Sequence, residues 1–145
     1  MAIPISTFMT RETKSVAPQT SVAKAYALMR EHRIRHLPVV SGGKVIGILS
    51  HRDLLKLEAR ANVDRSLDPV SDAMTPDPYL VPPTEPLVSV VSTMALRKLG
   101  SAVVVDGGRP IGIFTTTDAL RAFASLLRGE QDHEREAALR AAAID

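Results

Sequence analysis

The stretch RHLPVVSGGKVIGILSHRD, residues 35–53, decides the fold, because it returns 65 positions later as GSAVVVDGGRPIGIFTTTD, residues 100–118. The offset stays constant from Phe8 to Leu57, without a gap, and 14 of these fifty positions are identical in the second half. A constant offset over this length indicates two copies of one structural unit. Two similar units can pack about a pseudo-twofold axis, so that each wall of a shared cleft comes from a different copy.

Each copy carries the pattern of a strand, a helix, two strands and a second helix. Val and Ile on both sides of a Gly-Gly turn predict a β-hairpin in each half. Apolar residues at helical spacing precede and follow each hairpin. The sequence therefore predicts an α/β (α+β) fold of two pseudo-symmetric β-α-β-β-α repeats, packed sheet to sheet as one module. The predicted parts are extended pieces at 14–16 and 79–81, first helices capped by Thr20 or Ser21 and by Thr84, hairpins at 37–49 and 102–114, and second helices that begin near His51 and Thr116.

The boundaries follow from the same alignment. We assign the first repeat to residues 7–60, a polar linker to 61–72, the second repeat to 73–127 and a helical tail to 128–145. Gly129 is a candidate stop for the last helix of the second repeat. The tail is either solvated or packed on a partner chain, and its composition does not distinguish the two.

The composition narrows the class of protein. The chain has 145 residues, the size of one globular domain, and a copy of about 60 residues would bury too little surface alone. It has no cysteine, which excludes disulfides, thiolate catalysis and cysteine-type zinc sites. No apolar run approaches the roughly 20 residues of a membrane span, and the start MAIPISTFMT lacks the features of a signal peptide. We therefore expect a cytoplasmic protein with no membrane partner.

The charge is unevenly divided between the halves. Residues 1–65 carry a net charge of +6, and residues 66–145 carry −4. One interpretation is a chance difference in the charged surface residues of the two halves, with a favourable attraction between them. The other is that the first copy supplies cations to an anionic ligand.

Each hairpin ends in the same signature, Gly-apolar-apolar-hydroxyl-x-x-Asp, with Ser50 and Asp53 in the first copy and Thr115 and Asp118 in the second. A hydroxyl followed three residues later by an acid is a capping box, which satisfies N–H groups at a helix start. The same groups at the edge of a cleft have a second use. A carboxylate can accept both hydroxyls of a ribose, and free N–H groups at a helix start can hold a phosphate. The two interpretations are compatible.

Other residue patterns do not indicate catalysis, a metal or nucleic acid. The Gly-Gly turns lack the Gly-Lys-Ser/Thr of a P-loop, so we expect no nucleotide hydrolysis. The histidines come without an acidic ligand cluster, and Ser50 comes without an oriented base, so neither a metal site nor a hydrolase triad is expected. The basic run Arg30, Arg33 and Arg35 has no interleaved aromatic residues. We predict that the chain is not an enzyme and requires no cofactor.

These motifs together resemble a known family. Taken in order, the MT dipeptides at 9–10 and 74–75, RHLPVV, the Gly-Gly hairpins, GILSHRD and GIFTTTD resemble a tandem pair of cystathionine β-synthase-type (CBS) domains, or Bateman module. The resemblance covers about residues 7–127. It implies a disc-like module with two clefts between the repeats. It also implies regulation by adenosine-containing ligands (AMP, ADP, ATP, sometimes S-adenosylmethionine), frequent homodimers and no catalysis by the module itself.

The resemblance further implies which residues meet a ligand, since each cleft takes its hydroxyl-x-x-Asp from one repeat and its base-contacting strand largely from the other. For cleft one the implied residues are Val16, Arg35, His36, Leu37, Pro38, Thr115, Thr117 and Asp118. For the weaker cleft two they are Ser50, Arg52, Asp53, Val81, Ser101 and Ala102.

The two clefts are not predicted to be equivalent. In cleft one Asp118 would hold the ribose, Val16 and Leu37 would flank the base, and Arg35 and His36 would meet a phosphate. In cleft two the basic pair is replaced by Gly-Ser. We therefore predict that cleft one is the better nucleotide site, and that cleft two is weaker or selects a different ligand.

Two hypotheses of function follow. The first is a regulatory module that binds AMP, ADP or ATP between its repeats, forms a homodimer and acts on an effector protein. The alternative is a ligand-free structural module for dimerisation, with vestigial clefts.

Overall fold

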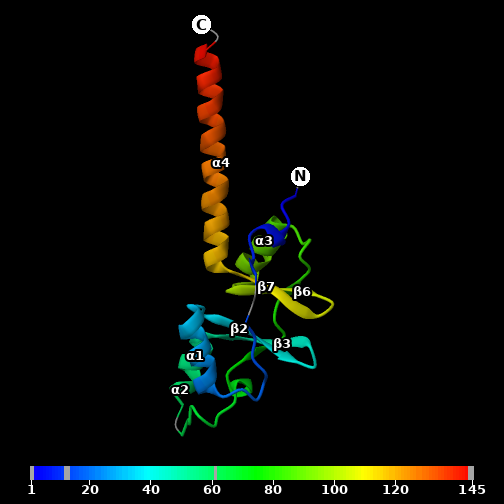
Figure 1. The fold of residues 1–145 in the computed structure, drawn as a ribbon, viewed down its shortest axis with the longest axis vertical. Helices are drawn as coiled ribbons and strands as arrows, with labels where there is room; N and C mark the ends of the chain where they lie inside the picture. Colours follow the sequence, from blue (N-terminus) through cyan, green and yellow to red (C-terminus); the bar gives the residue numbers. More distant parts are fainter. Residues whose placement is uncertain (1, 12–13, 61, 144–145) are drawn as a thin grey trace.

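The computed structural model describes residues 2–11, 14–60 and 62–143, with side chains up to residue 129. Figure 1 shows the two halves of the chain stacked one on the other, with the first repeat below the second. The last helix, α4 (Thr116–Ala143), runs far beyond the body of the second repeat.

Every element of the first copy recurs 65 residues later, which confirms the predicted pair of mixed α and β repeats. Only the second helix of each repeat differs in length. The matched elements are η1 (Ile5–Thr7) and η2 (Val70–Asp72), β1 (Thr10–Arg11) and β4 (Thr75–Pro76), α1 (Val22–His32) and α3 (Leu87–Arg97), β2 (His36–Ser41) and β6 (Ser101–Asp106), β3 (Lys44–Ser50) and β7 (Arg109–Thr115), and α2 (His51–Glu58) and the start of α4. The bridge of Val16 to Val39 occupies the place that β5 (Leu80–Val81) has in the second repeat.

The two predicted hairpins are present, and both depend on their glycine pairs. Gly42 and Gly43 have φ angles of 59° and 78°, and Gly107 and Gly108 have 60° and 83°. Positive φ at both central residues of a two-residue turn matches the right-handed twist of the flanking strands, and glycine reaches it without strain.

Two sequence predictions about helix ends are wrong. Thr84 does not cap α3: that helix begins at Leu87 after an extended Pro86, without a side-chain cap. Gly129 does not end α4, because the helix continues to Ala143. A single glycine costs a helix only about 1 kcal/mol relative to alanine, and the residues on both sides of it are good helix formers. In contrast, the predicted cap at Ser21 is confirmed, since its hydroxyl accepts from the N–H of Lys24.

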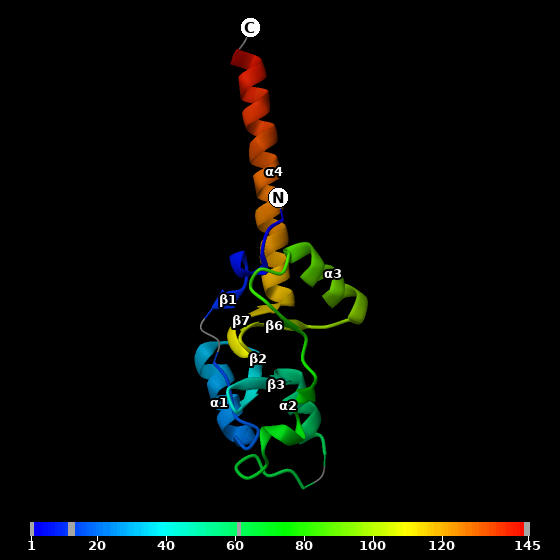
Figure 2. The same ribbon diagram turned by 90° about the vertical axis from the view of Figure 1, so that its right-hand side faces the viewer.

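The repeats exchange their first strands. One sheet has the order β1-β7-β6-β5 and the other has β2-β3-β4. The strand β1 therefore joins the sheet of the second repeat by pairing with β7, and β4 joins the sheet of the first repeat by pairing with β3. This arrangement ties the two repeats together through main-chain hydrogen bonds, and Figure 2 shows β1 beside β7.

The hydrophobic cores follow the same exchange. Ile5 and Met9 pack in the core of the second repeat, with Val90, Phe114 and other aliphatic residues. Val70, which matches Ile5 after the shift of 65, packs in the core of the first repeat. Each core is thus completed by a segment that precedes the other repeat.

The absence of a side chain at Gly47 and Gly112 makes this exchange possible. A Cβ atom on Gly47 would lie 2.7 Å from Sδ of Met74, and one on Gly112 would lie 2.5 Å from Sδ of Met9. Each methionine belongs to the segment that crosses to the other sheet. Met and Gly therefore recur at the same positions of the two halves because each methionine packs on the glycine of the other repeat.

Candidate functional site

The hydroxyl-x-x-Asp signature of the first repeat forms the predicted capping box. The N–H of Ser50 donates to Oδ2 of Asp53 at 2.8 Å, and the N–H of Asp53 donates to Oγ of Ser50 at 3.0 Å. Across the hairpin, His36 lies opposite Ser50 in the strand register. The carboxylate of Asp53 is therefore fixed at the start of α2, at the same end of the sheet as His36.

The signature of the second repeat is more fully bonded. Oδ2 of Asp118 accepts from the N–H of Thr115 at 2.9 Å and from its hydroxyl at 3.1 Å. Oδ1 accepts from the hydroxyl of Thr10 at 3.0 Å and from Nη1 of Arg121 at 3.3 Å. Asp118 is only 3% exposed. The exchanged strand β1 thus supplies a hydrogen bond to the carboxylate that was predicted to hold a ribose.

The carboxylates of the two aspartates have different hydrogen-bond partners, although their backbone positions match. The counterparts of Thr10 and Arg121 in the first repeat are Thr75 and Lys56. Within the described residues, neither of these donates to Asp53, whose Oδ1 has no protein donor there. Asp53 is half-buried, so this oxygen is more open to an incoming donor than either oxygen of Asp118.

His36 lies between the two signatures. Burial lowers the pKa of His36, the charge of Arg35 lowers it further, and the carboxylates of Asp53 and Asp118 both act in the opposite direction. A Cβ atom on Gly100 of the second repeat would lie 3.7 Å from Nε2 of His36. The imidazole therefore faces the second repeat, within electrostatic reach of both aspartates.

The stability of the protein should depend on the protonation of His36. Because its pKa is lowered in the folded state, the neutral imidazole contributes stability above the unfolded pKa of about 6.5, and this contribution is lost as the pH falls through the folded pKa. We expect the wild-type protein to lose more unfolding free energy between pH 7.5 and pH 5.5 than a His36→Gln variant. Urea unfolding at the two pH values measures the difference. Equal losses would show that His36 is not the group responsible.

The structure places four of the predicted apolar residues in the hydrophobic cores. Val16 and Leu37 of cleft one are buried in the core of the first repeat. Val81 and Ala102 of cleft two are buried in the core of the second. These side chains pack under the helices of their own repeats, and the predicted place of Val16 and Leu37 beside a base stays a prediction. Pro38 is also fully buried, with its carbonyl accepting from the N–H of Val16.

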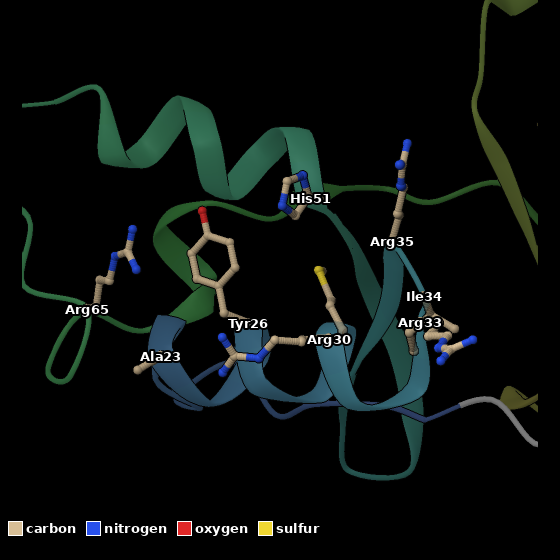
Figure 3. Close-up of a pocket in the computed structure, with 9 residues that line it drawn as sticks. Ala23, Tyr26, Arg30, Arg33, Ile34, Arg35, His51 and Arg65 are labelled. Atoms are coloured by element: carbon tan, nitrogen blue, oxygen red, sulfur yellow. The ribbon is translucent and has the colours of Figure 1, made fainter.

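The remaining predicted residues lie at the surface. Thr117 and Arg52 are exposed in the first turns of α4 and α2, and Ser101 is half-buried opposite Thr115 in the strand register. Arg35 is exposed and lines a cavity of about 710 Å³ between α1 and α2 of the first repeat, beside His51 (Figure 3). This first-repeat cavity, lined also by Tyr26, Arg30, Arg33 and Arg65, was not predicted from the sequence.

The described residues offer neither a metal site nor a membrane-spanning helix. They contain no group of three or more His, Asp or Glu side chains placed to hold a metal ion. Among them, no helix combines the length and the apolar character that a membrane span requires.

Comparison with known proteins places the chain among proteins with tandem repeats of this kind. The family model described as "CBS domain" matches residues 5–60 and again residues 70–125. The chain is 37% identical over 112 residues to an inosine-5'-monophosphate dehydrogenase from Korarchaeum cryptofilum, a match that covers 77% of this chain but only 22% of the enzyme. The chain therefore spans about a fifth of the length of that relative.

Two solved structures have the same fold over nearly their whole length. A candidate acetoin utilization protein (AcuB) from Vibrio cholerae superposes with a TM-score of 0.80 at 28% identity, covering 91% of this chain and 98% of that one. CBSX2, solved in complex with AMP, superposes with a TM-score of 0.72 at 30% identity, covering 85% of this chain and 97% of that one.

Proposed function

The chain belongs to the CBS-domain family, and we propose that it is a regulatory module that binds an adenine nucleotide (AMP, ADP or ATP) between its two repeats. The observation that carries the proposal is the pair of carboxylates, Asp53 and Asp118, held at helix starts within electrostatic reach of His36. A fixed carboxylate can accept hydrogen bonds from both hydroxyls of a ribose. The AMP complex of CBSX2 supports the choice of ligand.

The proposed ligand meets a different set of residues in each cleft. In cleft one, the ribose lies on Asp118, the hydroxyls of Thr115 and Thr117 stand at the start of the helix, and a phosphate lies toward His36. In cleft two, Asp53 takes the ribose, with Ser50, Arg52 and Ser101 at the edge. We keep cleft one as the stronger site, because hydrogen bonds to a buried carboxylate are less weakened by water than those to an open one.

A ligand at Asp118 must replace a contact that the chain already makes. The hydroxyl of Thr10 occupies Oδ1 of Asp118, and it belongs to the exchanged strand β1. Occupation of cleft one therefore loosens a contact between the first strand and the second repeat. This is a route by which nucleotide binding changes the surface presented to an effector protein.

We propose no catalytic role for the module. The hydroxyl of Ser50 accepts from the N–H of Asp53, and the hydroxyl of Thr115 bonds to Asp118. Both hydroxyls serve as helix caps, and the carboxylate beside each is itself bound to the N–H of the cap residue. The cytoplasm as its location stays a prediction, consistent with a chain that contains no cysteine.

A thermal-shift series with AMP, ADP, ATP, NADH and S-adenosylmethionine tests the proposal. A ligand that binds only the folded state raises the unfolding temperature. At a concentration 100 times Kd it adds about 2.7 kcal/mol to the free energy of unfolding. We expect adenine nucleotides to raise it and to be recovered unchanged after incubation. If millimolar concentrations of all five leave the midpoint where it was, the protein is the structural module of the alternative hypothesis. Turnover of any of them would show an enzyme.

We also propose that the protein forms a homodimer through the outer helices of the second repeat. The helices α3 and α4 carry exposed large apolar side chains, and on α4 Leu120, Phe123 and Leu127 follow at i, i+3 and i+7 along one helix face. Monomers rarely keep contiguous exposed apolar surface. A twofold pairing would cover the same patch on both copies. The residues and their exposed fractions are Val88 (66%), Leu96 (85%), Leu120 (64%), Phe123 (61%), Leu126 (42%) and Leu127 (43%).

The first repeat indicates the substitution that tests the dimer. Phe123 corresponds to Glu58 after the shift of 65. We expect wild-type protein to elute with twice the mass of one chain in size-exclusion chromatography with light scattering, and a Phe123→Glu variant to elute as a monomer with unchanged circular dichroism. A monomeric wild type at micromolar concentration would contradict the proposal.

A further inference from the structure

Apart from Arg35, which is also a predicted residue of cleft one, the lining of the first-repeat cavity takes no part in the nucleotide clefts. Its polar residues are Tyr26 and Arg30 on α1, Arg33 and Arg35 after that helix, His51 at the start of α2, and Arg65 in the loop beyond it (Figure 3). All the residues that line it lie between Ala23 and Arg65, so the second repeat contributes none. The cavity is therefore distinct from a cleft formed between the repeats.

The second repeat has a cavity in the matching place, and it is of a different kind. That cavity measures about 220 Å³ and is lined mainly by Val91, Met94, Ala95 and Leu99. After the shift of 65, Val91 corresponds to Tyr26 and Ala95 to Arg30. The same fold thus has a large cationic cavity on one repeat and a small apolar one on the other. The fold alone does not require arginines at this place.

The charge at the first-repeat cavity is strongly positive. Four arginines line it, and none of the described residues that line it is acidic. Glu58 lies behind the lining and neutralises one of them through its ion pair with Arg65. The end of α1 adds about half a negative charge. The net excess still amounts to more than two positive charges, gathered from the half of the chain that carries +6.

One wall of the cavity is held in place. The hydroxyl of Tyr26 donates to Oε2 of Glu58 at 2.9 Å. The guanidinium of Arg65 lies over the Tyr26 ring, 5.0 Å from its centre. The His51 ring packs edge-on against the Tyr26 ring, with 5.8 Å between the two ring centres. Burial and the hydrogen bond to Glu58 raise the pKa of Tyr26, so this network persists at neutral pH. Arg30, Arg33 and Arg35 are exposed, and among the described residues none of the three forms an ion pair with a carboxylate.

We propose that the first-repeat cavity is a second ligand site, which binds a small molecule with two or more phosphate groups. A volume of about 710 Å³ lies within the range of small-molecule sites, roughly 300–1,000 Å³. A planar guanidinium group can donate two parallel hydrogen bonds to two oxygens of one phosphate. Three arginines without an ion-pair partner therefore match a ligand with several phosphate oxygens. The proposal does not depend on nucleotide binding between the repeats.

Titration calorimetry with inorganic pyrophosphate tests the site. We expect binding that weakens as salt is raised, because exposed charges are screened. The variant Arg30→Ala, which installs the residue of the second repeat, should weaken binding about tenfold or more, as expected for the loss of one charged hydrogen bond. Alanine is a good helix former, so the fold should be kept, and circular dichroism checks this.

Two control variants make the result specific. Lys24→Ala removes an exposed cation from the same helix but outside the cavity, and it should leave the affinity within about twofold. Asp118→Ala, in protein that circular dichroism shows to be folded, should leave pyrophosphate binding intact, whatever it does to AMP. The proposal is overturned if wild-type protein does not bind pyrophosphate, if Lys24→Ala weakens binding as much as Arg30→Ala, or if Asp118→Ala removes it.

Discussion

An Ile5→Ala variant will lose about 2–5 kcal/mol of unfolding free energy, the range for a fully buried large aliphatic side chain. Ile5 is 0% exposed and packs in the core of the second repeat, although it precedes the first repeat in the chain. Its backbone is also bound there, since its N–H donates to the carbonyl of Glu85 at 2.7 Å. The truncation therefore removes a side chain from a core that begins some 70 residues later in the sequence.

The location of the damage distinguishes this explanation from a general loss of stability. Amide hydrogen exchange should accelerate first in β6 and β7, with β2 and β3 less affected. The matched variant Val70→Ala should show the reverse, because Val70 packs at 0% exposure in the core of the first repeat. If Ile5→Ala weakened protection mainly in β2 and β3, the exchange of segments would be contradicted.

The repeat structure was predictable because its signals are local. The Gly-Gly turns, the helical spacing of apolar residues and the capping boxes each depend on neighbours within a few positions. The internal alignment then doubled the evidence, since Gly42 and Gly107, or Asp53 and Asp118, support each other. The structure has these elements at the same offset of 65.

The exchange of first strands could not be predicted from the same signals. The strands β1 and β4 are two residues long, so they carry no periodicity. Their partners are set by contacts across the interface, such as Sδ of Met9 against Gly112. The alignment contained the relevant residues, because Met9 matches Met74 and Gly47 matches Gly112. It did not show that each methionine meets the glycine of the other repeat.

The site was predicted in part. The capping role of Ser50 and Asp53 followed from their spacing, and the structure confirms it. The buried positions of Leu37 and Ala102 were missed because alternation along a strand does not show which face meets the helices and which meets the other repeat. The first-repeat cavity was missed for a related reason: Tyr26, His51 and Arg65 come from three separate segments. The visible signals were the excess of positive charge in the first half and the replacement of Tyr26 and Arg30 by Val91 and Ala95.

Asp118→Ala will weaken AMP binding by about 10- to 150-fold, if the ribose is held as proposed. This range corresponds to losing the 1.5–3 kcal/mol of a hydrogen bond to a charged group. Asp53→Ala should cost less, because the half-buried Asp53 competes with water for the same hydroxyls. Isothermal titration of both variants measures the ranking. A greater loss for Asp53→Ala would reverse it, and no loss for either would remove the ribose role from both aspartates.

The variant Thr10→Val separates binding from folding in this comparison. Asp118→Ala also removes the partner of Thr10 and a helix cap, so part of its effect is on stability. In Thr10→Val the carboxylate keeps its cap but loses the hydroxyl that a ribose must displace. We expect AMP to bind Thr10→Val several-fold more tightly than wild type, while Thr75→Val, which removes a hydroxyl that does not contact Asp53, leaves the affinity unchanged. Weaker binding by Thr10→Val would instead mean that Thr10 contacts the ligand. In that case β1 would form part of the bound site and would not compete with the nucleotide.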